Sequence, residues 1–516
     1  MRLQNKIPNQ YPRVISKSFK MFGSPSSLRG ALMSLLAMSS GVEAYRWFNW
    51  QFDITCEATA YYVPANESEL VEFVKYHYPR KTLLKPVGNG HGFGNLTTCV
   101  NDKDTDRESY ILSLTNLKHL DIHEDHTVTF GGGWDLVDLM PALEESGLQV
   151  ANLGSEKVQN YIGASTTGTH GTGKQHQNLA TQIVGLRVLD AKGEIHHITK
   201  EDTPDLLKAY SIAIGALGII VEVTIQAEPL AYLKRTTKLV EGPNNITELY
   251  ELVAEIGETY EQVNIVGPTL KWDDSKHELV LNPNITLVYW EETDYKGVRN
   301  CSLDFCSNDC GRCDRDYHCY DYKMEAIATT PSGICYRGFM GQFEHFFPKE
   351  HLAEIGTDYL TYAQAQSERM KPHIDESIIG PGLKGHYLSD DVTVITRFIK
   401  GDDNWLSPVN NYNLQPNASG IFATLELSWV PTYNNFTTQY FFQELASEYI
   451  PKFGETYNVR PHWNKMLFHN ETYSATIYPK IHDWVDIREK NDPNCQFVNG
   501  FLAESLGIER CQYLFD

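Results

Sequence analysis

The chain has 516 residues, 41% of them hydrophobic and 12% aromatic, and a formal net charge of −22. This length allows two or three packed regions with cores of their own, and the composition is ordinary for a globular protein. The negative charge disfavours nucleic acid and anionic membranes as partners. Since no apolar run reaches the roughly 18 residues of a membrane helix, the sequence predicts no membrane span.

The N-terminal segment 1–44 is expected to be a leader. Arg29 precedes a short apolar stretch that ends in the small-residue sequence Val42–Ala44, which is typical of a signal peptide cleaved after Ala44. The alternatives are a transit peptide or an amphipathic helix, because Met1–Lys20 is basic. A signal peptide predicts secretion to the extracellular space.

Cysteines and glycosylation signals favour the same compartment. All ten cysteines follow the leader, and their even number suits disulfides. Glycosylation acceptors belong on secreted surfaces. Asn95 lies inside a glycine-rich motif, so we expect it to be buried and unmodified. Asn-x-Ser/Thr sequons occur at Asn66, Asn95, Asn245, Asn284, Asn300, Asn417, Asn435 and Asn470.

The first half of the mature chain, 45–229, alternates short strands and helices. Its pattern predicts an α+β domain with glycine-rich turns. Helices are expected at Glu67–His77 and Trp134–Ser146. Strands are expected at Thr82–Val87, Ile111–Leu114, Thr127–Phe130, Ile183–Asp190 and Ile219–Ala227.

Residues 230–440 have longer alternating strands, and residues 441–516 begin with a helix and return to turns. The middle region therefore predicts a sheet covered by helices. Its expected elements are the strands Asn284–Trp290, Val392–Ile399 and Ile421–Trp429 and a helix near His351–Gln366.

A cysteine-rich insert, 300–335, interrupts the middle region. Zinc binding and redox chemistry are alternatives for this spacing, but disulfides are favoured in a secreted chain, and their pairing cannot be read from the sequence. The insert contains Cys301, Cys306, Cys310, Cys313, Cys319 and Cys335.

Three glycine-rich segments offer backbone donors and close approach to a ligand. Gly88–Asn95 follows the strand that ends at Val87, and glycines there can direct N–H groups at a pyrophosphate. The spacing is not that of a Rossmann GxGxxG turn, and His91 alone could be a turn residue. Gly154–Ser155 with Gly163–Gly173 suits a flat ligand, and Gly215–Ile220 interrupts a strand.

Together these motifs resemble the FAD-binding domain of the vanillyl-alcohol oxidase family, nearest its aldonolactone oxidase and alditol oxidase branch. The shared motifs are Gly90-His91, Leu153–Ser155, Gly168–Gly171 and Gly215–Gly218, and the resemblance runs from about Tyr62 to Leu506. It implies a PCMH-type FAD-binding domain of two subdomains at 45–229, a substrate (cap) domain at 230–440, and a C-terminal segment, 441–516, that completes the active site.

The resemblance also implies that FAD is bound covalently, through the His91 imidazole and the flavin 8α-methyl group. A second tether through cysteine is not expected, because no Cys occurs between Cys99 and Cys301. Further cofactor contacts are carried over to Val87, Gly88, Asn89, Gly90, Gly92, Ser155, Asn160, Gly163, Thr167, Gly168, Thr169, His170 and Ile219.

On the substrate side, His462–Lys465 resembles the family's His-Trp-Gly-Lys signature, with Asn464 in place of Gly. By this likeness His462 binds substrate and Lys465 is catalytic. Arg397 matches the Arg of the family's Glu-x-Arg strand, but Ile395 stands where Glu is usual. The specificity for a lactone or an alditol is therefore not carried over.

The missing carboxylate has a candidate replacement. Glu426 and Ser428 alternate on one face of the next strand, and Glu426 is a candidate base or hydroxyl ligand, with Ser428 a further substrate contact. The alternative is that Glu426 is a solvated acid on a strand face. Glu344 matches a family Glu that binds substrate or is structural.

These residues predict an oxidase that passes a hydride from a sugar-derived alcohol, alditol or aldonolactone to covalent FAD and then to O2, giving H2O2. A dehydrogenase with another acceptor and a binding protein on a flavoenzyme scaffold are the alternatives. The expected partners are a small sugar-like substrate and O2. We expect a monomer without a metal site.

Overall fold

A computed structural model of the protein describes residues 44–512 except 51, 53, 100–106, 274, 277, 298, 300, 302–316, 328–340, 366–390, 430–453, 455 and 467–469. Residues from Ala44 onward form one compact unit. The predicted leader up to residue 43 and the helix expected from residue 441 lie outside the described residues. The same holds for Cys306, Cys310, Cys313, Cys335, Asn300 and Asn435.

The first subdomain is built on a parallel sheet of three strands in the order β3-β5-β4. Helix α2 (Glu67–His77) begins where Asn66 accepts a hydrogen bond from the Glu69 amide. Its apolar face, with Leu70 and Val74, packs on the sheet. The strands are β3 (Ala60–Tyr62), β4 (Leu83–Pro86) and β5 (Ser109–Leu112).

The second subdomain is an antiparallel sheet in the order β10-β9-β11-β7-β6, with three helices packed around it. The strands are β6 (Leu120–Ile122), β7 (Thr127–Gly131), β9 (Ile183–Leu189), β10 (Ile195–Thr199) and β11 (Ile219–Gln226). The helices are α3 (Leu136–Glu145), α4 (Tyr161–Ser165) and α5 (Pro204–Ser211). A short pair, β8 (Leu148–Gln149) and β12 (Glu228–Pro229), leads into the cap.

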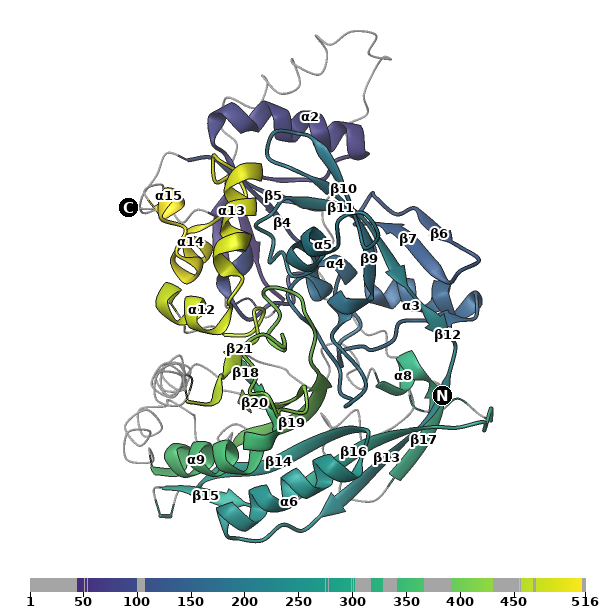
Figure 1. The fold of residues 1–516 in the computed structure, drawn as a ribbon, viewed down its shortest axis with the longest axis vertical. Helices are drawn as coiled ribbons and strands as arrows, with labels where there is room; N and C mark the ends of the chain where they lie inside the picture. Colours follow the sequence, from purple (N-terminus) through teal and green to yellow (C-terminus); the bar gives the residue numbers. More distant parts are fainter. Residues whose placement is uncertain are drawn as a thin grey trace, which may run out of the picture. The chain divides into compact units, whose positions relative to one another are not determined.

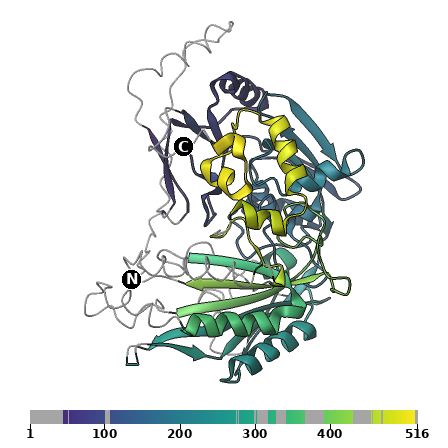
Figure 2. The same cartoon turned by 60° about the vertical axis from the view of Figure 1, so that its left-hand side comes forward.

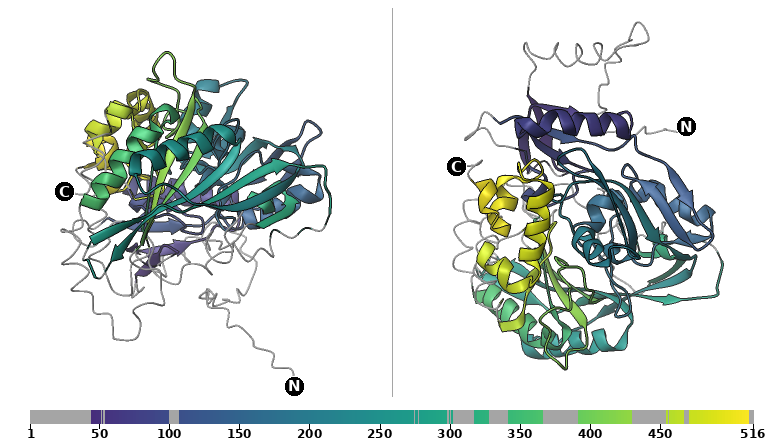
Figure 3. Two further views of the ribbon diagram at one scale, coloured as in Figure 1. Left: turned by 90° about the horizontal axis from the view of Figure 1, so that it is seen from below. Right: turned by 45° about the horizontal axis from the view of Figure 1, so that its top comes forward.

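The cap is a nine-stranded antiparallel sheet in the order β17-β13-β16-β14-β19-β20-β18-β21, with β15 paired to β14. Helices α6 (Ile246–Thr259) and α9 (Leu352–Ala365) cover one face, as Figures 1, 2 and 3 show. The strands are β13 (Tyr232–Val240), β14 (Gln262–Asp273), β15 (Glu278–Asn282), β16 (Ile285–Glu292), β17 (Tyr317–Tyr322), β18 (Gly341–Pro348), β19 (Asp391–Lys400), β20 (Ile421–Trp429) and β21 (Arg460–Pro461). Alternation along the strands puts apolar side chains under these helices and polar ones on the opposite face.

The C-terminal segment leaves β21 at the edge of the cap sheet and packs on the FAD-binding half, beside its strands in Figure 3. Its helices are α12 (Glu471–Ile477), α13 (Ile481–Asn491), α14 (Gly500–Leu506) and α15 (Glu509–Gln512). The predicted C-terminal segment is thus shared between both halves rather than belonging to the cap.

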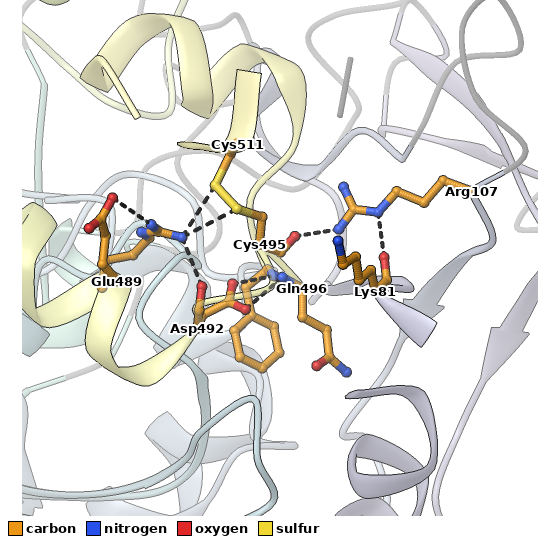
Figure 4. Close-up of a disulfide and its surroundings, with 9 residues drawn as sticks. Lys81, Arg107, Glu489, Asp492, Cys495, Gln496 and Cys511 are labelled. Atoms are coloured by element: carbon orange, nitrogen blue, oxygen red, sulfur yellow. Dashed lines mark hydrogen bonds and ion pairs between the residues drawn. A yellow bond between two sulfur atoms is a disulfide. The ribbon is translucent and has the colours of Figure 1, made fainter. Parts of the chain in front are cut away.

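A disulfide and a buried ion network fix this segment. Cys495 and Cys511 are joined, and the buried Arg488 guanidinium donates to the Asp492 carbonyl at 2.9 Å (Figure 4). The Asp492 carboxylate accepts hydrogen bonds from the amides of Gln496 at 2.7 Å and Phe497 at 2.9 Å. These bonds satisfy buried polar groups that would otherwise cost about 1–3 kcal/mol each.

The expected α+β fold is confirmed. Helix Glu67–His77 and strand Ile421–Trp429 have the predicted bounds, and the other predicted elements agree within a few residues. The sequence did not predict the N-terminal hairpin of β1 (Tyr45–Phe48) and β2 (Thr55–Ala58), which is too short for a clear period. The six described cysteines form three disulfides, Cys56–Cys99, Cys301–Cys319 and Cys495–Cys511. Across the described residues, helices of bilayer-spanning length and hydropathy are absent.

Candidate active site

The glycine loop after β4 presents a row of backbone donors. The amides of residues 88–92 have no hydrogen-bond acceptor among the described residues. Gly90 has a φ of +64°, and an added Cβ at Gly88 would lie 2.4 Å from Cβ of Asn160. Only glycine fits both positions without strain. Consecutive free amides in a tight loop are a donor set that fits the pyrophosphate of FAD.

Asn160 joins this loop to the second glycine-rich motif. Its side chain caps α4 by accepting from the amides of Ile162 at 3.1 Å and Gly163 at 3.2 Å, while its Nδ2 donates to two carbonyls at 3.0 Å. The protein therefore uses this side chain fully, which makes Asn160 a support for the loop. An added Cβ at Gly163 would meet no atom within 4 Å, so a flat ligand has room beside this backbone.

The remaining predicted cofactor residues line or support the same motifs. The Thr167 hydroxyl donates to the Gly163 carbonyl at 2.9 Å, and the φ of +79° at Gly168 lets the chain turn against Pro408. Asn89 donates from its side chain to the Val158 carbonyl. Ser155 is half-buried, and three further residues are buried, namely Val87, Thr169 and Ile219.

The cap sheet contributes a cluster of two carboxylates and a guanidinium. Register places Glu426 of β20 between Glu344 of β18 and Ile395 of β19. Arg397 lies with Nη1 3.4 Å from the Glu344 carboxylate and Nη2 3.1 Å from that of Glu426. Its Nε donates to Oδ1 of Asn264 on β14 at 2.9 Å. Arg397 therefore contacts polar side chains from β14, β18 and β20 and fixes their positions relative to one another.

Glu426 is not a solvated strand-face acid. Its side chain is 1% exposed and ion-paired with Arg397, so that alternative is wrong. The position next to it across the strands is Ile395, where the family motif has a carboxylate. A carboxylate is thus present in the same region of the sheet, from the neighbouring strand.

A chain of polar contacts leads from Glu426 to the glycine loop. The Gln342 amide donates to Glu426, and Lys465 Nζ donates to the Gln342 carbonyl oxygen. Lys465 Nζ also lies 4.9 Å from the centre of the Phe93 ring, and the Phe93 amide donates to the Asn464 carbonyl at 3.0 Å. The C-terminal signature and the glycine loop are therefore packed against each other.

Two buried histidines surround Glu344. His170 Nε2 lies 3.1 Å from the Glu344 carboxylate, and His462 Nδ1 accepts a hydrogen bond from the Asn464 amide at 3.0 Å. Burial lowers the pKa of His462 to about 3, so this ring is neutral at ordinary pH. Burial alone would raise the pKa of Glu344, but His170 and Arg397 outweigh it and lower that pKa well below its usual range.

The ligand atoms of His170, Glu344 and His462 lie within 4.8 Å of one another, as in a metal site. The Arg397 guanidinium, however, occupies the position beside the Glu344 carboxylate. A metal cation there would meet a fixed positive charge, which favours the reading as a hydrogen-bonded ion-pair network.

His91 lies in the glycine loop against an aromatic ring. It stacks on Trp50 with ring centres 4.9 Å apart and an interplanar angle of 6°. Burial, and then the charge of Lys465, lower the pKa of His91 to about 4. The imidazole is therefore neutral near pH 7 and keeps a nucleophilic nitrogen lone pair. Asn95, which we expected to be buried, is exposed.

Sequence reasoning missed Asn264, Gln342 and Trp50. Gln342 lies two residues before Glu344 on one strand face, so alternation could have found it. Asn264 and Trp50 lie in or beside elements that the sequence did not predict. The backbone of Ser428 pairs with Gln342, but its side chain lies outside the described part of the chain.

Two family models match the chain. An FAD-binding domain matches residues 58–199, which contain the first two glycine-rich motifs, and a D-arabinono-1,4-lactone oxidase model matches residues 382–505. An L-gulono-1,4-lactone dehydrogenase of Mycobacterium tuberculosis is 35% identical over 469 residues, covering 89% of this chain and 99% of that protein. The chain belongs to the aldonolactone oxidase family.

Other members of this family are similar over different lengths. Mouse L-gulonolactone oxidase is 25% identical over 493 residues, covering 90% of this chain and 99% of that protein. D-arabinono-1,4-lactone oxidase of Saccharomyces cerevisiae is 31% identical over 206 residues, covering 39% of this chain and 38% of that protein. The protein is accordingly an FAD-linked oxidoreductase of the aldonolactone oxidase and dehydrogenase type.

Solved structures agree on the fold. A solvent-stable cholesterol oxidase has a TM-score of 0.65 at 14% identity, covering 90% of this chain and 97% of that chain. A cholesterol oxidase of Brevibacterium sterolicum has a TM-score of 0.65 at 13% identity with the same coverage. At these identities the likeness supports the fold of the aldonolactone oxidase family and nothing about substrate.

Gly163→Leu should block the cofactor and leave the fold intact. A Cβ at this position of α4 meets no protein atom within 4 Å, so the leucine side chain is directed into the room expected for the ligand. We expect an unchanged melting temperature and loss of most flavin absorbance per polypeptide. Glu145→Leu, at an exposed helical position of the same subdomain, is the control; a full flavin load in Gly163→Leu would place the cofactor elsewhere.

Proposed function

We propose that this aldonolactone oxidase family member oxidises a sugar-derived lactone or related alcohol, with FAD attached through His91 and O2 as electron acceptor. The observation that carries the proposal is the buried Arg397 network, which Gln342 and Lys465 join to the His91 loop. Buried titratable groups with shifted pKa values beside a glycine-rich loop favour a functional site over a purely structural core.

The substrate class follows from the polar groups that face the site. Two carboxylates accept hydroxyl hydrogen bonds, and the Arg397 and Lys465 cations donate to carbonyl or developing alkoxide oxygens. A neutral polyhydroxylated lactone offers both kinds of group. This choice is supported by the names of the relatives, which act on L-gulonolactone and D-arabinono-1,4-lactone.

FAD supplies the acceptor for the electron pair of the oxidised C–H bond. The residues of the chain handle the proton and the charge. Glu426 accepts the proton of the substrate hydroxyl, and Arg397 holds that carboxylate at a fixed angle. Lys465 stabilises the negative charge that develops on the substrate oxygen. One preorganised donor of this kind contributes about 3 kcal/mol. His462 stays neutral and orients its neighbours.

The electron acceptor has two candidates. L-gulonolactone oxidases and L-gulono-1,4-lactone dehydrogenases both match this chain over nearly their full length. O2 is the acceptor that suits the predicted secretion, because the intracellular electron carriers of a dehydrogenase are absent outside the cell.

A holoenzyme assay on a panel of aldonolactones and alditols tests the reaction. We expect one H2O2 per lactone oxidised, and flavin colour that stays with the protein through acid precipitation because His91 holds it. Reduction of an artificial dye without peroxide formation would make the protein a dehydrogenase. Release of the colour on denaturation would refute the covalent link but not FAD binding.

Glu426→Gln and Arg397→Ala should each slow substrate-dependent flavin reduction by about 10²-fold or more. The first removes the base and keeps its shape, and the second frees both carboxylates from their common cation. Bound flavin should be retained, since neither residue belongs to the glycine loops. Stopped-flow reduction measures the rate. Glu292→Gln, which changes an exposed acid on β16, is the control. Parent-like rates in both Glu426→Gln and Arg397→Ala would show that the substrate binds elsewhere.

We also propose that the protein is secreted, glycosylated and disulfide-bonded. The sequon asparagines in the described part of the chain are all exposed, which supports glycosylation: Asn66, Asn95, Asn245, Asn284, Asn417 and Asn470. In three of them, Asn66, Asn245 and Asn470, Oδ1 caps a helix, which leaves Nδ2, the atom that carries a glycan, available.

Glycosidase treatment of protein from the culture medium should lower its mass, and unfolding without reductant should expose few reactive thiols. The physical basis is an oxidising compartment, in which the six described cysteines are paired. Site mapping by mass spectrometry, with Asn417→Gln as a single-site reference, measures occupancy. An unshifted mass together with five or more free thiols would contradict secretion.

A further inference from the structure

The N-terminal hairpin β1–β2 covers the loop that contains His91. All of it but Ala58, the last residue of β2, precedes the residues matched by the FAD-binding domain model, 58–199. The Trp50 amide donates to the Gly90 carbonyl at 3.0 Å, and Asn49 Nδ2 donates to the Gly92 carbonyl at 3.1 Å. The hairpin therefore binds the loop backbone on both sides of His91.

Aromatic contacts add to these bonds. Trp50 stacks on the His91 ring and meets the Phe93 ring edge-on, with centres 5.7 Å apart at 82°. Cζ2 of Trp47 lies 3.2 Å from where a Cβ on Gly90 would stand. The loop thus follows the surface of the hairpin closely, and the His91 ring has one face covered by Trp50.

A disulfide anchors the hairpin to the end of the same segment. Cys56 of β2 is joined to Cys99, and the Cys99 amide lies 2.8 Å from Cys56 Sγ. Both cysteines share a small core with Trp47 and with Val87, the residue that leads into the loop. Val87 before the glycine loop, Cys99 after it and the hairpin are therefore parts of one packed unit.

We propose that this hairpin is a positioning element for flavin attachment: Trp50 holds the His91 ring in one orientation, and the Cys56–Cys99 disulfide holds Trp50 in place. The inference rests on the proposed covalent FAD. It gives cofactor loading a requirement in the segment that precedes the glycine loop along the chain.

Attachment forms one bond, between a ring nitrogen of His91 and the 8α carbon, and breaks one C–H bond at that carbon. The C–H hydrogen and the imidazole N–H hydrogen end on the flavin with two electrons, and O2 then takes both protons and both electrons as H2O2. His91 has to approach with a neutral nitrogen at a fixed angle. A ring held by stacking meets this demand, since misplacement by about 1 Å costs on the order of 10²-fold in rate.

Trp50→Leu and Trp50→Phe test the stacking contact. The full chain is produced with limiting flavin and then supplied with FAD, and acid-stable flavin per polypeptide is followed over time. We expect attachment to slow by about tenfold or more in Trp50→Leu, with reversible FAD affinity and melting temperature unchanged. Trp50→Phe should restore most of the rate because it keeps a ring against His91, a rescue that loss of packing alone would not give.

The paired change Cys56→Ser with Cys99→Ser should slow attachment in the same assay. The matched control removes the cap disulfide with Cys301→Ser and Cys319→Ser, and it should attach FAD at the parent rate. Parent-like attachment in Trp50→Leu and in the Cys56/Cys99 pair would overturn the role of the hairpin and leave the proposed function standing. Acid-labile flavin in the parent itself would instead refute covalent attachment, and the hairpin proposal with it.

Discussion

The active-site face of the cap depends on Arg397, whose guanidinium pairs with both Glu344 and Glu426. Both carboxylates are 1% exposed, and they face each other on adjacent strands, where like charges repel. A cation between two buried carboxylates stabilises their ionised forms, and removing one partner of a buried ion pair costs about 3–5 kcal/mol. The orientation of Gln342, and through it of Lys465, follows from this arrangement.

The sequence has Ile395 on β19 and a carboxylate, Glu426, on the neighbouring strand β20, and this placement bears on specificity. Ile395 and Glu426 are direct cross-strand neighbours, so their Cβ atoms are separated by only about 5 Å. A carboxylate moved by this distance still reaches Arg397, but it approaches a substrate hydroxyl from a different direction. The resemblance implies a carboxylate at position 395, and Glu426 on the neighbouring strand offers one at a different position. We expect this change to select among lactones by the configuration of a single hydroxyl-bearing carbon.

Strong local signals made much of the fold predictable. The helical spacing of Glu67–His77 predicted α2, and the period-2 pattern of Ile421–Trp429 predicted β20. The burial of Glu426 could not be predicted in this way, because alternation gives the strand face but not what covers it. Asn264 was missed for a related reason, since its contact with Arg397 requires the register of β14 against β19. Local sequence thus defined the elements, and pairing between distant strands defined the site.

Two distant parts of the chain meet at the glycine loop. Trp50 follows β1, Asn464 and Lys465 precede the C-terminal helices, and all three contact the loop residues His91 or Phe93. The first part is joined by the Cys56–Cys99 disulfide to the residues that follow the loop, and the second contains the Cys495–Cys511 disulfide farther along the chain. Because the loop backbone is rich in glycine, its own conformational preference is weak. Its ordering therefore depends on contacts from both segments.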